Sequence, residues 1–195
     1  MKKILILLGI SGLLLAACKK DNKTYFTESG SLTVTNKVIG GKALTFNTTT
    51  YTIGTDAYQT MPIKAGDQQV KLYDAANKTA APYFNEKMQI ENAGRYSLFL
   101  AGASPANIDA IQIKDNYTAY TDSLCGVRFI NLSPNSPKLS VNVTGAANGS
   151  TVTGIAYKEY SDFVKFPAKR ANSSYSFEIR NAATGEVIRS YDIST

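Results

Sequence analysis

Histidine and tryptophan are absent from this 195-residue chain, and cysteine occurs only twice. The lack of histidine excludes an imidazole general base, a Ser-His-Asp triad and any histidine-containing metal site. The sequence also contains no Gly-x-Ser-x-Gly, no Ser-x-x-Lys, no phosphate-binding glycine loop and no calcium-loop spacing. Its 15 acidic residues are scattered, which does not suit the paired carboxylates of a glycosidase. We therefore expect a protein that is not an enzyme and that uses no cofactor or metal.

The positive charge of the chain is modest and dispersed. There are 21 basic and 15 acidic side chains, a net charge of +6, and Lys and Arg never form a long block. Nucleic-acid-binding surfaces are strongly basic, so we expect no nucleic-acid partner. Among the acids, Asp109 and Asp115 flank one strand-like segment, and Asp122 follows it. Such a pattern is typical of a solvated surface.

The one long apolar run lies at the N-terminus. Residues 4–17 carry no charge, follow Lys2 and Lys3, and end in small side chains. A basic start, a short apolar stretch and a small-residue end are typical of a secretory signal peptide, which we place at residues 1–17. A transmembrane anchor is the alternative, but it needs roughly 20 apolar residues, and two glycines weaken this run.

The end of this run, Leu15-Ala16-Ala17-Cys18, resembles the bacterial lipobox, Leu-[Ala/Ser]-[Gly/Ala]-Cys, at every position. The resemblance implies that the Cys18 sulfur carries diacylglycerol, that the chain is cut before Cys18, and that the new amine is acylated, as with palmitate. One acyl chain anchors a protein only marginally, whereas two or three hold it on the membrane stably. Because Lys19 rather than Asp follows the cysteine, the resemblance also implies sorting to the outer membrane of a Gram-negative cell, facing either the periplasm or the exterior.

Residues 18–29 are polar and unpatterned, and we expect a lipidated tether there. The rest of the chain alternates apolar and polar residues in short segments that Gly, Asn, Asp or Pro separate. Leu32 and Val34, for example, alternate with threonines. This pattern predicts an all-β fold of antiparallel sheets, each with one face toward water.

The strand pattern occurs twice. Residues 31–47 align with residues 126–142 without a gap, at an offset of 95, and residues 70–78 match residues 177–185 at an offset of 107. Two units of this size fit two small β-sandwiches better than one large domain. The sequence therefore predicts a tandem repeat.

The later pair of matching segments enters a turn. Asp74 and Asn181 begin these turns, and each side chain is expected to bond its own backbone two residues further on. We place the first β-sandwich domain at residues 30–113, a polar linker at residues 114–124 and the second domain at residues 125–195.

A longer motif, VRFINLSPNSPKLSVNV, opens the second unit. It resembles the signature of a domain-of-unknown-function family that is often duplicated in bacterial envelope lipoproteins, and the first unit shares only its strand rhythm. Ser140 and Asn135 stand where the family often has Asp. The resemblance implies an immunoglobulin- or transthyretin-like β-sandwich, and it brings no catalytic residues. The matching positions are Arg128, Asn131, Ser133, Pro134, Asn135, Pro137, Leu139 and Val141.

The prolines of this motif have a structural consequence. Pro134 and Pro137 lack N–H donors, so the strand ladder must break between them. Ser133 and Asn135 are expected to satisfy the freed backbone groups. A rigid corner between two strands is the main interpretation, and a ligand-binding loop is the alternative.

The second unit is shorter than the first. Only 14 residues follow Asn181, which leaves room for one strand over residues 187–193 where the first unit has three. Its sheet should therefore be small, lean on its neighbour or keep an unpaired edge, and an open edge is a template for another chain's strand. A naturally abbreviated domain and a truncated reading frame are the alternatives to a strand-accepting assembly.

Four tyrosines and one serine are candidate site residues. Tyr117 with Tyr120, and Tyr157 with Tyr160, are candidate binding platforms for a sugar or a peptide, although tyrosine is also ordinary in sheets. Ser123 lies in Asp-Ser-Leu, which resembles a bacterial O-glycosylation acceptor and also suits an ordinary turn.

Cys125 has no partner for an internal disulfide once Cys18 is lipidated, and its apolar neighbours predict a buried side chain. Taken together, the sequence predicts a non-catalytic, lipid-anchored envelope protein with a structural, adhesion or assembly role and a protein or glycan partner. The alternative is a glycan-binding accessory protein or an unrecognised glycan-active enzyme. Carboxylates gathered in a cleft, or Tyr117 and Tyr120 exposed side by side, would favour that alternative.

Overall fold

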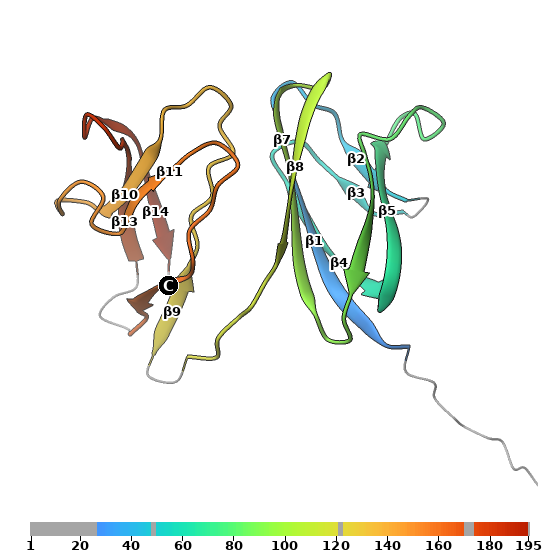
Figure 1. The fold of residues 1–195 in the computed structure, drawn as a ribbon, viewed down its shortest axis with the longest axis horizontal. Coiled ribbons are helices and arrows are strands. Elements are labelled where there is room, and N and C mark those ends of the chain that lie inside the picture. The colour runs from blue at the N-terminus through green and yellow to red at the C-terminus, as the bar shows by residue number, and fades with distance from the viewer. Residues whose placement is uncertain (1–26, 48–49, 121–122, 170–173, 195) are drawn as a thin grey trace, which may run out of the picture.

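The computed structural model describes residues 27–47, 50–120, 123–169 and 174–194, and these residues form strands and no helix. The predicted all-β fold is therefore confirmed. Figure 1 shows two β units next to each other, joined by one extended segment between β8 and β9. The predicted signal peptide and Cys18 lie outside the described residues. Within the described ranges, no helix has the length and apolarity needed to cross a membrane.

The first unit consists of two four-stranded sheets. One has the order β4-β1-β7-β8 and the other the order β3-β2-β5-β6. All neighbours are antiparallel except β1 and β7, which run parallel. The strands are β1 (Ser29–Val38), β2 (Leu44–Phe46), β3 (Thr52–Ile53), β4 (Tyr58–Lys64), β5 (Gly66–Asp74), β6 (Phe84–Ile90), β7 (Arg95–Ser104) and β8 (Asn107–Lys114).

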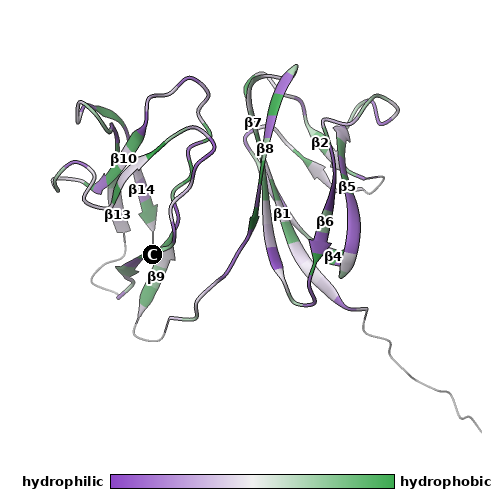
Figure 2. Cartoon of the chain, viewed as in Figure 1, coloured by the Kyte–Doolittle hydropathy of each residue, from purple (hydrophilic) through white to green (hydrophobic). Residues whose placement is uncertain are grey.

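The core of the first unit lies between these two sheets. Along β1 the inward residues Leu32 and Val34 are fully buried, while Thr33 between them is only half-buried. Figure 2 shows this alternation of hydrophobic and hydrophilic residues along the strands. Sixteen buried side chains form one continuous cluster. Burial of apolar surface at about 25 cal/mol per Å² makes this cluster the main stabilising element of the unit.

The second unit is smaller and has a thinner core. It contains one four-stranded sheet, β11-β10-β13-β14, and one two-stranded sheet, β12-β9. Among the described residues its cluster has Val141, Phe166 and Phe177 as buried members, and partly buried apolar residues surround them. The rings of Phe166 and Phe177 meet edge to face, 5.1 Å apart. The strands are β9 (Leu124–Val127), β10 (Leu139–Val143), β11 (Val152–Ile155), β12 (Val164–Pro167), β13 (Ser174–Asn181) and β14 (Val187–Ser194).

The two units share a sheet order and a strand register. Strands β3-β2-β5-β6 correspond to β11-β10-β13-β14, and β4-β1 correspond to β12-β9. Leu44 pairs with Asp74 across β2 and β5, and Leu139 pairs with Asn181 across β10 and β13. In the described part of the second unit no strand corresponds to β7 or β8. Within the described residues the second unit therefore has fewer strands than the first, as the sequence predicts.

The predicted side-chain bonds in the two turns are also present. The Ala76 N–H donates to Oδ1 of Asp74 at 2.9 Å, and the Ala183 N–H donates to Oδ1 of Asn181 at 3.0 Å. Each side chain therefore replaces a backbone acceptor at the first position of its turn.

One buried asparagine occupies the same place in each unit. Asn36 is 0% exposed and Asn131 is 2% exposed. Each side-chain oxygen accepts the N–H two residues on, from Val38 at 3.5 Å and from Ser133 at 3.0 Å. Each amide nitrogen donates to a backbone carbonyl of a distant segment, that of Gly54 at 3.2 Å for Asn36 and that of Ile155 at 3.3 Å for Asn131. In both units the buried amide therefore bonds a backbone carbonyl at the end of a distant strand, at Ile155 of β11 and at Gly54 directly after β3.

The strand ladder breaks at the two prolines of the motif, as predicted, because residues 134–138 belong to no strand. The side chains that bond there differ from those predicted. Asn131 accepts from Ser133, and its amide donates to Oγ of Ser136 at 2.9 Å. Asn135 instead adopts a left-handed backbone with φ of 65°. Asn131 takes over the task expected of Ser133 and Asn135 because it lies buried at the base of the corner.

Candidate functional site

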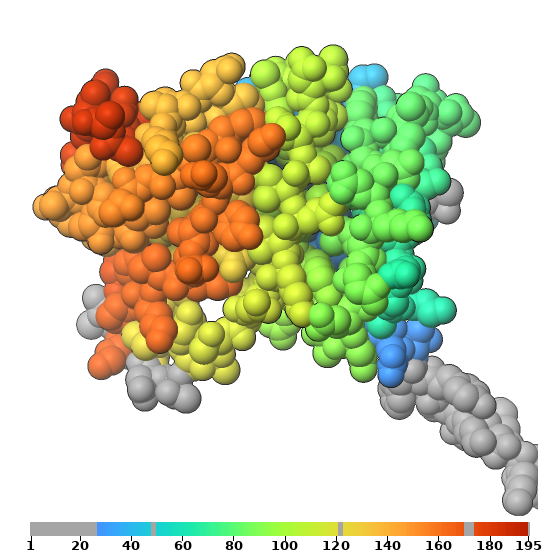
Figure 3. Space-filling view, viewed as in Figure 1, coloured from blue at the N-terminus to red at the C-terminus, as the bar shows by residue number. Residues whose placement is uncertain are grey.

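The two units meet through an ion pair between the end of β8 and the end of β9. The Nη1 of Arg128 donates to Oδ1 of Asp115 at 2.8 Å, and their side chains are 15% and 6% exposed. Ser97 donates its hydroxyl to the other carboxylate oxygen of Asp115 at 2.6 Å. Figure 3 shows the units in contact along facing surfaces. The expectation that Asp115 lies on a solvated surface is wrong, because the second unit covers it.

Aromatic rings surround the arginine of this pair. The guanidinium of Arg128 lies 4.1 Å from the ring centre of Phe163 and 5.4 Å from that of Tyr160. Its Nε is buried and has no hydrogen-bond partner in the described part of the chain. Cation–π attraction strengthens when the cation is removed from water. The rings therefore compensate part of the free energy that Arg128 loses because its Nε has no hydrogen bond. We call Asp115, Arg128 and Phe163 the inter-unit clamp.

A second stack continues from the clamp into the first unit. Tyr117, which is 56% exposed, lies 5.5 Å from Phe163, ring centre to ring centre. The guanidinium of Arg95, at the start of β7, lies 5.2 Å from the Tyr117 ring centre. Partial burial and, to a smaller extent, the charge of Asp115 raise the pKa of the Tyr117 hydroxyl. The ring therefore stays neutral at physiological pH and bridges the two units.

A second polar contact joins the units at Asp109 on β8. Tyr157 donates its hydroxyl to Oδ2 of Asp109 at 2.9 Å, and Lys158 donates to Oδ1 at 2.9 Å. The bonds from Lys158 and Tyr157 hold the pKa of Asp109 below its usual value of 3.8. Burial, aided by the bond to Asp109, raises the pKa of Tyr157 to about 12. Asp109 is thus engaged by the other unit, while its carboxylate remains 39% exposed.

The low pKa of Asp109 predicts a pH-dependent contribution to stability. Ionised Asp109 favours the folded chain, so its contribution is complete above pH 3.8 and is lost as the pH falls through the lower folded-state pKa. We expect Asp109→Asn to lower the free energy of unfolding at pH 7 by less than about 1 kcal/mol, because the pair is partly exposed. The difference should disappear in strong acid. Urea denaturation across the pH range measures it, with Asp56→Asn, 87% exposed, as the control. A difference that stays constant below pH 3.8 would contradict the assignment.

The four predicted tyrosines lie in the region where the units meet, but they do not form the predicted pairs. Tyr120 lies against Gly126, where an added Cβ would come within 2.9 Å of the Tyr120 ring. In the described part of the chain no ring contact joins Tyr117 to Tyr120, or Tyr157 to Tyr160. Each ring instead has its own partner across or beside the contact.

Ser123 and Cys125 flank the start of β9. Ser123 is exposed and has φ of 53°, and its carbonyl accepts the Ala168 N–H at 2.6 Å. Its neighbour Asp122, the other polar residue of the O-glycosylation motif, lies outside the described residues. Cys125 is half-buried against the cluster that contains Phe166, so it is less buried than predicted.

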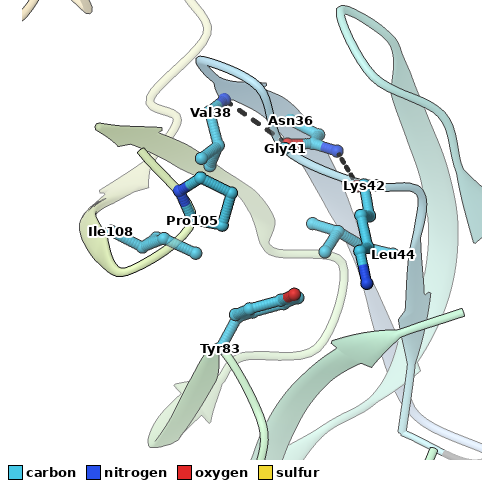
Figure 4. Close-up of a pocket in the computed structure, with 8 residues that line it drawn as sticks. All are labelled: Asn36, Val38, Gly41, Lys42, Leu44, Tyr83, Pro105 and Ile108. Atoms are coloured by element: carbon cyan, nitrogen blue, oxygen red, sulfur yellow. Dashed lines mark hydrogen bonds between the residues drawn. The ribbon is translucent and has the colours of Figure 1, made fainter. Parts of the chain in front are cut away.

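The described surface is hollowed at the following places, among others. One, between Asn36, Leu44, Tyr83 and Pro105, leaves no room for a water molecule (Figure 4). Another is an open depression of about 740 Å³ at the start of β7 and the end of β8, next to the segment that leads to β9. Its lining combines charged, polar and aromatic groups: Glu91, Arg95, Lys114, Asp115, Asn116 and Tyr117. Within it Lys114 forms an ion pair with Glu91, and this pairing raises the pKa of Lys114.

The sequence alone does not predict the clamp. Arg128 belongs to the motif that opens the second unit, and Phe163 belongs to no motif. No local pattern indicates their contact, because it depends on how two folded units pack. The position of Asp115 is the sequence feature that hints at the contact, because Asp115 directly follows the last strand of the first unit.

Comparison with known proteins places the chain in a family. Residues 37–142 match a family described as "Domain of unknown function (DUF4397)". No curated protein matches the sequence. Among solved structures, the C-terminal domain of AlgF from P. aeruginosa is similar over 45% of this chain and 99% of that one, with 15% identity and a TM-score of 0.35. That likeness is too distant to carry an argument about function. Because the family match spans more than half of the sequence, the chain belongs to the DUF4397 family.

Proposed function

We propose that this protein is a non-catalytic, lipid-anchored module of the bacterial cell envelope, with a structural, adhesion or assembly role. The observation that carries the proposal is the lipobox-like sequence Leu15-Ala16-Ala17-Cys18 at the end of a short apolar run. In this proposal residues 1–17 are removed, and palmitate and diacylglycerol at Cys18 hold the mature chain on the outer membrane. Two or three acyl chains suffice for stable attachment, since each buried CH₂ contributes about 0.8 kcal/mol.

The arrangement of the folded part supports a role in contact rather than in chemistry. Several ionisable side chains of the folded part bind each other. Asp115 pairs with Arg128, and Asp109 binds Tyr157 and Lys158. These contacts fix the second unit against the first, as suits a rigid body that presents a surface to a partner. In this proposal residues 30–113 and 125–195 are the two domains, and residues 114–124 link them.

We further infer that the two domains arose by duplication. The matching sheet order, the equivalent pairs Leu44–Asp74 and Leu139–Asn181, and the buried asparagines Asn36 and Asn131 support this inference. A polar side chain buried at the same place, with the same two kinds of bond, is not required by a β-sandwich in general. A common ancestor accounts for it.

The lipid anchor is tested by replacing the cysteine. We expect Cys18→Ala to abolish incorporation of radiolabelled palmitate and to release the protein from the membrane fraction, because the variant has no thiol to modify. Cys125→Ala is the matched control, since it removes the other cysteine, and it should be labelled like the wild type. Palmitate that still enters the Cys18→Ala variant would refute the anchor. Protease treatment of whole cells then distinguishes a surface-exposed from a periplasmic orientation.

A glycan-binding role is the second candidate. It is supported by the open depression in which the exposed Tyr117 ring and the Arg95 guanidinium lie together. An aromatic face packs against a sugar ring, and guanidinium binds carboxylates in a fixed geometry. Binding of the purified protein to envelope polysaccharide, lost in Tyr117→Ala and kept in Tyr58→Ala, would favour this role. Tyr58 is a suitable comparison because it is 72% exposed and does not line the depression.

A further inference from the structure

Strand β7 completes the first unit by running beside β1. Their parallel register places Leu32 beside Tyr96 and Val34 beside Leu98. On β7, Tyr96 is 6% exposed and Leu98 is 0% exposed, so these side chains fill the core. The strand also satisfies the backbone of β1 on this edge, where the Ser31 N–H donates to the Gly94 carbonyl at 2.9 Å.

Strand β9 is the counterpart of β1 in the second unit. It pairs antiparallel with β12 as β1 does with β4, so Val127 opposite Val164 corresponds to Leu32 opposite Met61. The N–H of Asn131 donates to the Glu159 carbonyl at 3.0 Å, as that of Asn36 donates to Ala57 at 2.9 Å. The register therefore continues beyond β9 to the buried asparagine.

The other edge of β9 faces no strand in the part of the chain that the structure describes. Backbone groups alternate between the two edges of a strand. The Ser123 and Phe129 carbonyls accept N–H groups of Ala168 and Ser161, so the backbone groups of the odd-numbered residues point toward β12 and the segment before it. Those of Gly126, Arg128 and Ile130 therefore point toward the open edge. These three residues correspond to the residues of β1 that β7 satisfies.

The core of the second unit is less completely covered near β9. Leu32 and Val34 of the first unit are 0% exposed, whereas their counterparts Val127 and Phe129 are only half-buried. Both belong to the partly buried residues around the small cluster of the second unit. An open backbone edge and an incompletely covered apolar layer thus lie together, which is the combination that strand addition requires.

We propose that the open edge of β9 binds an extended strand of a partner protein. The strand runs parallel to β9, as β7 runs parallel to β1, and presents apolar side chains at alternate positions beside Val127 and Phe129. The first unit shows which kind of strand fits there. In it β7 lies beside β1, the counterpart of β9, and places apolar side chains in the core. A second copy of the chain would have to release its own β7, which is held between β1 and β8. This proposal names the partner class for the assembly role above, and it does not depend on the lipid anchor.

The test uses the full chain carrying Cys18→Ala and a synthetic peptide of residues 95–114, which is the β7–β8 hairpin of the first unit. At a peptide concentration about tenfold above its dissociation constant, we expect amide exchange at Gly126, Arg128 and Ile130 to slow about tenfold. Exchange at Val127, whose N–H faces β12, should not change. A control peptide with Leu98→Asp and Leu100→Asp should have no effect, because it cannot enter the core.

A second variant keeps the test independent of the peptide's behaviour. Ile130→Pro removes one N–H from the open edge and leaves the edge toward β12 intact, so it should abolish the peptide effect while near-ultraviolet circular dichroism stays unchanged. Unchanged exchange at Arg128 and Ile130 with the native peptide would overturn the proposal. Protection of these amides without peptide, together with a dimer in sedimentation, would also overturn it, in favour of a second copy. The chain used in this test carries no lipid. Failure of palmitate labelling would therefore contradict the lipid anchor alone, and failure of strand binding would contradict the role of the β9 edge alone.

Discussion

Arg128→Ala is expected to lower the free energy of unfolding by about 3–5 kcal/mol, because it leaves the Asp115 carboxylate without its partner. Only 6% of the Asp115 side chain is exposed, so its carboxylate has little contact with water in the folded chain. The variant also loses the stacking of the guanidinium on Phe163, at 4.1 Å from the ring centre. Urea denaturation followed by circular dichroism measures the change.

Two comparisons isolate the cause of this loss. Arg189→Ala removes an exposed arginine that lies 5.8 Å from the Tyr191 ring centre, and it should change stability by no more than about 0.5 kcal/mol. The double variant Arg128→Met with Asp115→Leu should recover most of the stability, because no uncompensated charge remains. An Arg128→Ala variant within about 1 kcal/mol of the wild type would show that the clamp does not hold the units together.

Asn131→Ala is expected to lower the free energy of unfolding by about 2–4 kcal/mol. The substitution leaves the Ser133 N–H and the Ile155 carbonyl without the amide that bonds both, in a place where Asn131 is 2% exposed. Each buried group left unpaired costs about 1–3 kcal/mol. Hydrogen exchange should locate the loss in the second unit, around the corner between β9 and β10.

The equivalent residue provides a matched comparison. Asn36→Ala should have a similar effect in the first unit, where its amide bonds the Lys42 and Gly54 carbonyls at 2.9 and 3.2 Å. Asn116→Ala, at an exposed position in the segment after β8, should change stability by less than about 0.5 kcal/mol. An Asn131→Ala variant as stable as the Asn116→Ala variant would contradict the role assigned to the buried amide.

The fold was predictable where local pattern decides it. Alternation of Leu32 and Val34 with polar residues identifies the buried face of β1, and the offsets of 95 and 107 anticipate the equivalent pairings of Leu44 and Leu139. The turns at Asp74 and Asn181 follow from short-range chemistry. Alternation shows which face is buried but not which strand lies beside which, so the parallel neighbours β1 and β7 were not predictable.

The candidate site was less accessible from the sequence because it forms between two units. Asp115 reads as a solvated residue at the end of a strand, and only the packing of Arg128 and Phe163 against it removes it from water. Tyr117 and Tyr120, three residues apart in sequence, also have different partners, Phe163 for Tyr117 and Gly126 for Tyr120. Hydrophobic periodicity along the sequence indicates strands and their buried faces. It does not indicate which residues of two separate units come into contact.

The position of β1 determines how the first unit resists mechanical force. The chain enters the fold at β1, which lies in the middle of its sheet between β4 and β7 (Figure 1). Ladder hydrogen bonds run across the strands, so tension applied along β1 from its N-terminal end loads all of them in shear at once. The bonds to β4 and β7 would have to rupture together rather than one after another. This geometry suits a protein whose N-terminal end bears load.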